Sequence, residues 1–450
     1  MTDSVNRVFE FTTRVPDTIP KDVLRFASIL LVDTIAVAAA ATGMEAGRIA
    51  RDIAVEQFSA PHDKAVPIMF DGRMASPVGA AFAAASQIDN LDAHDGYNPT
   101  LGHIGCAVVP ALFAWAAKLP NLSGREALTA FVVGYEVATR AAIALHATVS
   151  DYHTSGAWNG LGVAAMGVRL HGASQDVLRQ SLGIAEYHGP RSQMMREIAN
   201  PTMLHDGSGM GAMTGMMAYE MAAKGFTGAP AITLESEGAR TYWDDLGTKW
   251  TVPLNYIKPY PICRWAHGAI DAVRRLKLDH AINAANVASM AVRTFDKSAK
   301  LFPGMPDTTS KAQYSLAFAL ATILRHGRIG VEHISGTALT DPATEALLSC
   351  ITIVEEPRHT ARFPAGRWAD VTITLNDGTV LESGDTNPRG GPEAPMSVAE
   401  IREKFDQFAS ASLSTKRANA IWETGLSLTN DEVKFSDLSC HVLQAVDTDA

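Results

Sequence analysis

The stretch FASILLVDTIAVAAAATGM, Phe26 to Met44, is the longest apolar run in the chain, and its interpretation decides the fold. A run of this length suits either a membrane span or a helix buried inside a folded protein. Asp33 stands in the middle of the run, where an ionisable group would be costly in a bilayer. Pro20, which precedes the segment, is well placed in the first turn of a helix. We therefore expect a buried helix and no membrane partner.

The composition around this helix is that of a folded globular protein. Hydrophobic residues make up 47% of the 450 residues and charged residues only 19%, which indicates extensive buried surface and excludes a disordered chain. The chain is longer than an ordinary single domain with one hydrophobic core, so its length predicts at least two domains. The formal net charge of -10 argues against general binding to nucleic acid, although a local basic pocket could still hold an anionic metabolite.

Cysteine usage and the N-terminus indicate a cytoplasmic location. The four cysteines lie far apart and form no CxxC pair, so the sequence predicts neither disulfides nor structural zinc. The first residues, MTDSVNRVFEFTTRV, have no apolar core of the signal-peptide kind. We expect a protein of the reducing cytoplasm.

Helical patterns dominate from Pro20 to about residue 270. Ser123 and Glu126 have the spacing of a capping box, which predicts that a helix begins there. The segment GSGMGAMTGMMAYEMAAKG, 207–225, is apolar on nearly every face and rich in small residues, as in a central helix against which others pack closely. We interpret its methionines as core filler.

The pattern changes after about residue 270. Two predicted strands, 286–295 and 350–356, flank a predicted helix, 310–327. A hairpin is predicted around Asn376-Asp377-Gly378, because both turn positions tolerate positive φ. This part of the chain therefore has an α+β pattern, unlike the part before it.

A linker rich in Pro and Gly then leads to Ser397 and Glu400, a second capping box that predicts the start of a C-terminal helix. The predicted fold class is mainly α. A large all-helical domain is formed by both chain ends, 1–268 and 398–450, and a smaller α+β domain, 269–397, is inserted between them.

Common motifs of nucleotide binding and nucleophilic catalysis are missing. The glycines at the start of 207–225 follow no strand, so they do not support a dinucleotide site. The sequence contains no Walker motif, HExxH pair or GxSxG elbow. A His/Asp metal site is disfavoured because no ligand pair has i, i+4 spacing in a clear helix. We therefore expect no metal and no organic cofactor.

Several histidines stand inside apolar segments, beside Gly, Pro or Asp, and basic or hydroxyl-bearing residues accompany them. Histidine can take and return a proton near neutral pH, and fixed cations stabilise the negative charge that develops when a proton leaves the carbon next to a carboxylate. The pattern therefore indicates proton-transfer chemistry on an anionic substrate. The group comprises His94, His103, His153, His188, His205 and His267, with Arg191, Arg196, Lys258, Tyr260 and Arg264.

Simpler roles remain open for each of these residues. A lone histidine in an apolar segment is most often structural, and His188 next to Gly-Pro fits loop packing equally well. Asp89 and Asp92 could cap or end a helix. Lys258 and Arg264 could pair with acids of the second domain.

Five segments give the chain a specific resemblance to the MmgE/PrpD family, which includes 2-methylcitrate dehydratase, cis-aconitate decarboxylase and iminodisuccinate epimerase. They are LLVDTIAVAAAATG, LDAHDGYNPTLGHIG, YHTSGAWNGLGVAA, TMLHDGSGMGAMTGMMAYEMAAKGFTGAP and KPYPICRWAHGAID, and the similarity extends over nearly the whole chain. The resemblance implies a homodimer of two-domain subunits, with the site between the helical domain and an α+β lid domain.

The resemblance also implies site residues. It matches the family's acidic site residue to Asp92 and its histidines to His103, His153 and His267. We add His205, in the segment PTMLHDG, as a further acid/base candidate. The candidates for substrate binding are Tyr97, Tyr152, Arg191, Lys258 and Arg264.

Two positions depart from the family's pattern. Thr202 stands where dehydratase and decarboxylase members usually have lysine, and Phe318 stands where the decarboxylase pattern has tyrosine, with Tyr314 close by. Losing an ammonium and a phenol changes which proton or carboxylate the site can handle. His205 could partly replace the lysine, but only its protonated form supplies comparable charge, so activity would then depend strongly on pH.

The sequence therefore favours a cofactor-independent lyase of a small anionic polycarboxylate, most simply a dehydratase of a hydroxy-polycarboxylic acid similar to 2-methylcitrate. Its close alternative is an isomerase or epimerase of an amino- or imino-dicarboxylate, which returns the proton to the opposite face of the carbon with a second base. An alternative of another class is a non-catalytic binding protein on the same fold.

Overall fold

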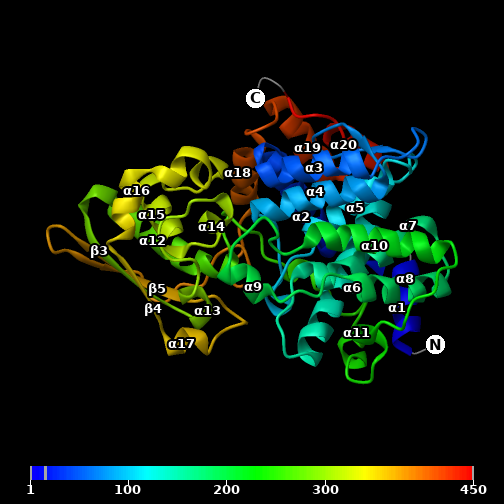
Figure 1. The fold of residues 1–450 in the computed structure, drawn as a ribbon, viewed down its shortest axis with the longest axis horizontal. Coiled ribbons are helices and arrows are strands. Elements are labelled where there is room, and N and C mark those ends of the chain that lie inside the picture. Colours follow the sequence, from blue (N-terminus) through cyan, green and yellow to red (C-terminus); the bar gives the residue numbers. More distant parts are fainter. Residues whose placement is uncertain (1–2, 15–17, 448–450) are drawn as a thin grey trace.

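The computed structural model describes residues 3–14 and 18–447 and is mainly helical, with a two-stranded and a four-stranded sheet (Figure 1), so the predicted mainly-α class is confirmed. Its α-helices are α1 (Asp3–Thr13), α2 (Lys21–Ala40), α3 (Glu45–Gln57), α4 (Pro77–Leu91), α5 (Gly105–Ala116), α6 (Gly124–Thr148), α7 (Asn159–His171), α8 (Gln175–His188), α9 (Met194–Ala199), α10 (Ser208–Ala223), α11 (Ile232–Glu235), α12 (His267–His280), α13 (Asp296–Ala299), α14 (Thr309–Gln313), α15 (Leu316–His326), α16 (Pro342–Leu348), α17 (Pro357–Thr360), α18 (Val398–Ala409), α19 (Thr415–Ser427) and α20 (Phe435–Val442). Its strands are β1 (Val66–Pro67), β2 (Met74–Ala75), β3 (Val287–Thr294), β4 (Ile351–Glu355), β5 (Ala369–Leu375) and β6 (Val380–Glu382).

Helix α2 runs through the interior, as its apolar sequence predicts. Among the described residues, two helical segments, Lys21–Gly43 and Gly124–Thr148, are long and apolar enough to cross a membrane, but 89% and 94% of their apolar stretches are buried inside the protein. Asp33 is fully buried, and its carboxylate accepts a hydrogen bond of 2.8 Å from Nζ of Lys404 in α18. This ion pair joins the first long helix to the C-terminal part of the chain, where α18 and α19 pack against α2.

Helix α10 has the central position that its small residues predict. A Cβ atom on Gly211 would lie 1.9 Å from Oδ1 of Asn159, and one on Gly215 would lie 2.4 Å from the Gly160 carbonyl oxygen, so α10 and α7 touch almost backbone to backbone. The interpretation of the methionines as core filler is wrong for the outer side of this helix, where Met210 and Met217 are 42% and 43% exposed. They are two helical turns apart, on the side left free when glycines and alanines make the contacts with α4, α5, α7 and α8.

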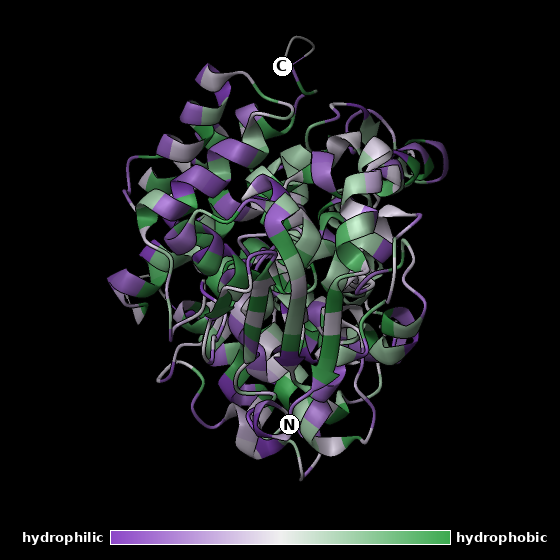
Figure 2. Ribbon diagram, turned by 90° about the vertical axis from the view of Figure 1, so that its left-hand side faces the viewer, coloured by the Kyte–Doolittle hydropathy of each residue, from purple (hydrophilic) through white to green (hydrophobic). Residues whose placement is uncertain are grey.

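The four-stranded sheet has the strand order β4-β3-β5-β6 and lies at one end of the molecule in Figure 1. β3 pairs parallel with β4 and antiparallel with β5, and β6 returns antiparallel to β5. The strands face the viewer in Figure 2, and α12 packs against β5, where Val371 and Ile373 are buried. The predicted hairpin is confirmed, because Gly378 has φ 88° and the N–H of Leu375 donates to the Thr379 carbonyl at 2.9 Å.

The sheet belongs to the chain segment between α12 and α18. α12 begins at His267 and α18 at Val398, near the predicted limits of the inserted domain, 269–397. In Figure 1 this segment occupies one end of the molecule, while α1 to α8 and α10, with α18 to α20, occupy the other. Hydrogen bonds join the two parts, for example from Nδ2 of Asn98 to the Ala365 carbonyl at 2.9 Å. The division into two domains stays a prediction.

The two predicted capping boxes have different outcomes. At α18, Ser397 Oγ accepts from the Glu400 N–H at 3.2 Å and the Glu400 carboxylate accepts from the Ser397 N–H at 2.8 Å, which confirms the prediction. Ser123 caps α6 by accepting from the Glu126 N–H at 3.1 Å, but the return bond is replaced. The Glu126 carboxylate accepts instead from the Arg169 guanidinium at 2.8 and 2.9 Å, because a bidentate charged pair is stronger than one bond to a neutral amide.

Candidate active site

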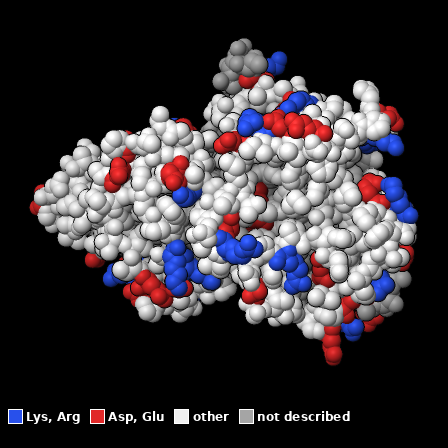
Figure 3. Space-filling view, viewed as in Figure 1, with Lys and Arg blue, Asp and Glu red and all other residues white. Residues whose placement is uncertain are grey.

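A small pocket forms where distant parts of the chain meet. Its wall combines the end of α4, the loop before α5, helix α9, the loop before α10, the segment before α12 and a residue that precedes β5. In Figure 3 side chains of both charge signs gather near the middle of the visible face, between the sheet-bearing end and the helical end. The pocket is lined by Asp92, Leu101, His103, Tyr152, Met194, Ile198, Asp206, Tyr256, Lys258, Cys263, Arg264, Trp265, Tyr314 and Arg367.

Asp92 enters the pocket from the end of α4, where its φ is 54°. Aspartate tolerates this left-handed conformation better than most side chains do. Its carboxylate, only 3% exposed, accepts a hydrogen bond from Nζ of Lys258, which also donates to the Asp92 carbonyl at 3.0 Å. Burial raises the pKa of Asp92, and the Lys258 ammonium opposes that effect. The charge of Lys258 is thus matched inside the pocket wall.

His103 is held as a neutral imidazole with one free lone pair. Its Nδ1 lies 2.7 Å from the Asp95 carbonyl oxygen, and a carbonyl can only accept, so Nδ1 carries the hydrogen. Burial lowers the pKa of His103 well below its ordinary value. The unprotonated Nε2 then points toward Asp206, with 3.7 Å between Nε2 and Oδ2. His103 is therefore in the form that a general base needs.

Asp206 faces His103 from the loop before α10. Ser155 positions the Asp206 carboxyl by donating from its Oγ at 2.6 Å and from its backbone N–H at 3.3 Å. Burial raises the pKa of Asp206 to about 6. The pocket therefore places a proton acceptor beside an acid that exchanges its proton close to neutral pH.

His205, the residue before Asp206, does not supply a positive charge. Its backbone has φ 46°, and its ring lies 5.6 Å from the ring of Tyr314, centroid to centroid. Burial lowers the pKa of His205 to about 3, so the side chain is neutral at physiological pH. The expectation that protonated His205 replaces the missing lysine is therefore not supported.

Hydroxyl and thiol groups in the wall keep their protons at physiological pH. Burial raises the pKa of Tyr152, Tyr256 and Tyr314 well above the ordinary value of a phenol. Burial also raises the pKa of the Cys263 thiol to about 12. The Tyr152 hydroxyl is used within the protein, because it donates to the Leu101 carbonyl. Tyr256, Tyr314 and Cys263 therefore offer neutral hydroxyl or thiol donors in the wall.

The structure brings only part of the predicted set together at this pocket. His267 lies behind the wall, where its Nε2 is 2.8 Å from the Ile262 carbonyl oxygen and its Nδ1 is 3.4 Å from the Arg264 guanidinium. It is placed to orient Arg264 rather than to touch a ligand. The predicted residues that line the pocket are Asp92, His103, Tyr152, Lys258 and Arg264, and His205 adjoins it through Tyr314.

Three predicted residues, His153, Tyr97 and Arg191, are not part of the pocket wall. The His153 ring stacks on the His146 ring with 6.5 Å between centroids. The backbone N–H of His153 donates to Nε2 of His146 at 3.2 Å. The Arg191 side chain is exposed. Tyr97 is half-buried in the loop before α5, where its N–H donates to the Gly102 carbonyl at 3.2 Å. Their part in binding a ligand stays a prediction.

Nine residues of the wall are absent from the predicted set, among them the polar residues Asp206, Tyr256, Cys263 and Arg367. Asp206 and Cys263 stand next to His205 and Arg264 in segments that were already prominent, so their neighbours were a usable signal. Arg367, in GRWADV, has no such signal. Only the packing of the segment before β5 against the loop after α4 brings it to the pocket.

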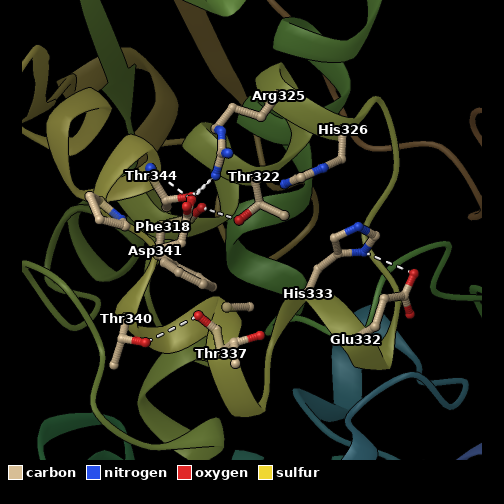
Figure 4. Close-up of a pocket in the computed structure, with 12 residues that line it drawn as sticks. Phe318, Thr322, Arg325, His326, Glu332, His333, Thr337, Thr340, Asp341 and Thr344 are labelled. Atoms are coloured by element: carbon tan, nitrogen blue, oxygen red, sulfur yellow. Dashed lines mark hydrogen bonds and ion pairs between the residues drawn. The ribbon is translucent and has the colours of Figure 1, made fainter.

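The two departures from the family's pattern have local explanations. Thr202 fastens the loop before α10, because its hydroxyl donates to the Glu197 carboxylate at 2.8 Å. Phe318 does not line the pocket but a second cavity of about 450 Å³, shown in Figure 4. Tyr314, four residues earlier and between α14 and α15, lines the pocket instead. A phenol is therefore still present at the site.

The second cavity is less suited to an anionic substrate. Its arginine, Arg325, is ion-paired with Asp341 and donates to Thr344 (Figure 4). His333 lies 3.2 Å from the Glu332 carboxylate. Because these basic groups already have partners, the cavity offers them less readily to a ligand than the pocket around His103 does.

Two groups of potential metal ligands occur among the described residues: Asp89, His94 and Cys106, and His359, Asp370 and Asp385. In the first group the Cys106 thiol donates to Ser208 Oγ at 3.1 Å, so it is already used within the protein. In the second group Arg358 already binds Asp370 and Asp385, each at 2.5 Å. Neither set is arranged as free metal donors.

Comparisons with known proteins agree with the resemblance. The MmgE/PrpD N-terminal domain matches residues 11–243, and the MmgE/PrpD C-terminal domain matches residues 260–430. A cis-aconitate decarboxylase-like protein of Aspergillus oryzae is 24% identical over 464 residues, which cover 92% of each chain. Cis-aconitate decarboxylase of Homo sapiens is 25% identical over 389 residues, 82% of this chain and 78% of the human protein. 2-Methylcitrate dehydratase of Cupriavidus necator is 29% identical over 132 residues, 27% of each chain.

Proposed function

The chain belongs to the MmgE/PrpD family, and on that premise we propose that it is a cofactor-independent lyase of a small polycarboxylate. Relatives named as cis-aconitate decarboxylase and 2-methylcitrate dehydratase support this class of reaction. Within the class we propose dehydration of a hydroxy-polycarboxylic acid, which begins with removal of a proton from the carbon beside a carboxylate.

The form of His103 is the observation that carries this proposal. Its Nδ1–H donates to the Asp95 carbonyl, and its unprotonated Nε2 faces Asp206 at 3.7 Å in a pocket that also holds Lys258 and Arg264. A neutral base beside fixed cations is what abstraction of a proton next to a carboxylate requires, since the base must be unprotonated and the developing charge must be stabilised.

The proposed reaction follows from these groups. His103 Nε2 takes the proton from the carbon, the electron pair forms the new double bond, and the carbon–oxygen bond to the substrate hydroxyl breaks. A neutral donor of the wall, such as Tyr256 or Tyr314, gives the proton that turns the leaving hydroxide into water. Lys258 and Arg264 stabilise the negative charge on the substrate while the proton is in flight.

The epimerase alternative is less well supported. It needs a second base on the opposite face of the same carbon, and two of the other acid/base candidates, His153 and His267, are not in the pocket wall. A non-catalytic binding protein would retain the cations of the pocket without needing a neutral His103.

Proton NMR in deuterated buffer tests the proposal directly. The protein is incubated with a panel of hydroxy-polycarboxylates, their unsaturated products and imino-dicarboxylates. The variants His103→Gln and His62→Gln are treated in the same way. His62 is the control because it is exposed and is remote in sequence from the residues of the pocket. We expect new vinylic signals with the native protein and with His62→Gln, and a loss of at least about a hundredfold in rate with His103→Gln.

Other outcomes separate the alternatives. Deuterium incorporation at a saturated carbon without vinylic product would replace the lyase by an epimerase. Tight binding of a polycarboxylate with neither exchange nor product would leave the non-catalytic alternative.

We also propose that the protein is a cytoplasmic homodimer. Exposed apolar side chains gather on one face of the helical end: Ile49, Ile53, Met203, Leu204 and Met210 line one surface groove, and Met217 continues it along α10. An exposed apolar surface of this kind is typical of an interaction site. A second copy is the partner implied by the resemblance to the family, and it would cover the loop that carries Asp206.

A further inference from the structure

Two arginines of the pocket, Arg264 and Arg367, are buried without an acidic partner. Their exposed fractions are 5% and 2%. Arg264 donates to the backbone carbonyls of Arg389 at 2.9 Å and Pro388 at 3.3 Å, and Arg367 donates to those of Pro364 and Asn98. Within residues 3–14 and 18–447, no carboxylate forms an ion pair with either guanidinium, and the Nε–H of each is buried without a hydrogen-bond partner.

This arrangement is unfavourable in the empty protein. A buried charge is costly unless an opposite charge or a full set of hydrogen bonds compensates it. The two guanidinium groups line the same pocket and repel each other. Burial lowers the pKa of Arg264, and the positive charge of Arg367 lowers it further. The third cation of the wall, Lys258, differs because Asp92 matches its charge.

An aromatic ring lies against each arginine: Tyr256 against Arg264, and Phe363 against Arg367 with 5.1 Å between the guanidinium carbon and the ring centroid. The Arg264 guanidinium carbon is 4.4 Å from the centroid of the Tyr256 ring. Burial raises the pKa of the Tyr256 hydroxyl, and the positive charges of Arg367 and Arg264 oppose that effect. Stacking on an aromatic face leaves the edge of a guanidinium free for bidentate contact with a carboxylate. The fork of Arg264 is therefore already oriented before a ligand binds.

The backbone around Arg367 is held by hydrogen bonds to two separate segments, the one before α18 and the loop before α5. The Arg367 backbone N–H donates to Oδ1 of Asn387 at 3.0 Å, and the neighbouring carbonyl of Ala365 accepts from Asn98 at 2.9 Å. The side chain thus reaches the pocket from the segment before β5 on a backbone that is fastened to the loop before α5. A preorganised donor of this kind binds with little loss of conformational freedom.

We propose that Arg264 and Arg367 form a subsite that binds two carboxylates of one ligand, one on each guanidinium. The inference rests on the proposed function and deepens it, because it assigns two carboxylates of the polycarboxylate to two named side chains and makes Arg367 a residue that determines specificity. A monocarboxylate leaves one buried guanidinium without a partner. A dicarboxylate satisfies both and removes the unfavourable burial of unmatched charge.

Calorimetric titration of the full chain tests the subsite with matched ligands. Succinate and glutarate are compared with butyrate and valerate, which have the same carbon numbers and one carboxylate fewer. We expect the native protein to bind a dicarboxylate at least about tenfold more tightly than its monocarboxylate match, because a charge-assisted hydrogen bond contributes about that much. Arg367→Gln should remove most of this preference and leave monocarboxylate binding nearly unchanged.

Two further variants keep the test sharp. Arg362→Gln is the matched control, because Arg362 lies on the same segment but pairs with Asp385 at 2.7 Å on the surface, and it should keep the native preference. Arg367→Lys keeps a charge and loses the planar fork, so it should retain part of the preference and shows whether a poorly folded Arg367→Gln protein is the cause of any loss.

Three results would overturn the inference: a native protein that does not prefer either dicarboxylate, an Arg367→Gln variant with unchanged preference, or equal losses for mono- and dicarboxylates. The NMR assay separates this failure from that of the proposed function. Turnover with an unaltered preference in Arg367→Gln would reject only the subsite. Binding of dicarboxylates that depends on Arg367 but brings no turnover would reject only the lyase.

Discussion

At the scale of single residues, burial decides the ionisation of the groups around the pocket. His103 and His205 are neutral because burial lowers the pKa of each, while burial raises the pKa of Asp206 to about 6. The residue types at these three positions can be read from the sequence, and all three stand in segments that resemble motifs of the family. Their protonation states cannot, because the degree of burial depends on segments that are remote in the chain.

Asp89 offers a test of this effect on stability. Burial raises the pKa of Asp89 to about 7. Its Oδ2 accepts from the Ser208 N–H at 2.9 Å, while Oδ1 accepts no hydrogen bond within the described residues and lies 3.6 Å from Nε2 of His94. Between the unfolded value of about 4 and the folded value, the folded state holds a proton that the unfolded state has lost, so stability falls as pH rises through this interval. Asparagine can keep the Ser208 bond without that penalty.

Asp89→Asn should therefore stabilise the protein little at about pH 4 and by a few kcal/mol, roughly 2–4, at about pH 8. Urea unfolding of both proteins across this pH range measures the difference. Asp63→Asn, which removes an exposed carboxylate, is the matched control. A constant difference between Asp89→Asn and native protein at every pH would contradict the assignment.

At the scale of helices and strands, local patterns predict the elements well and their orientation less well. The hairpin around Gly378 and the cap of α18 at Ser397 follow from turn and cap chemistry within a few residues. For α10 the small residues predict close packing, but its methionines are partly exposed. Which side of an apolar helix faces outward depends on its neighbours, and a helix that is apolar nearly all round carries no signal for that choice.

Gly211→Ala in α10 is expected to lower the free energy of unfolding by about 1–3 kcal/mol. Alanine normally stabilises a helix interior relative to glycine by about 1 kcal/mol, but the added Cβ would lie 1.9 Å from Oδ1 of Asn159 in α7. Thermal or urea unfolding measures the change. Glu220→Ala on the same helix, which loses only an exposed ion pair with Lys224, should change stability by less than about 0.5 kcal/mol. An unaltered or more stable Gly211→Ala protein would show that the helices can move apart without cost.

At the scale of the whole molecule, contacts between chain ends and between the two ends of the structure build both the core and the pocket. Lys404 of α18 neutralises Asp33 of α2, and Lys258 reaches Asp92 across 166 residues of sequence. The apolar face that remains exposed on α3 and α10 is the surface on which we propose the homodimer to form.

Charge placed on that face should separate the subunits. Ile53→Glu combined with Met210→Glu puts two carboxylates where apolar side chains are now 39% and 42% exposed. We expect the native protein to sediment as a dimer and the double variant as a monomer in analytical ultracentrifugation, because burying carboxylates at an apolar interface is costly. Leu278→Glu, at a residue that is 64% exposed on α12, should leave the dimer intact. A monomeric native protein, or a double variant that stays dimeric, would refute the interface.

The sequence by itself determined the buried helix α2, the α+β character of the segment after α12, the hairpin and the cap of α18. It also showed that histidines and basic residues occur together in the same segments. Each of these features depends on a pattern within a few neighbouring residues. Only the tertiary structure decided which candidates share a pocket. It placed Arg367 and Tyr256 in the wall and left His153 and Arg191 outside it, because those positions depend on how remote segments pack. The same packing removes water from His103 and Asp206, and the loss of water sets the pKa values on which the proposed chemistry depends.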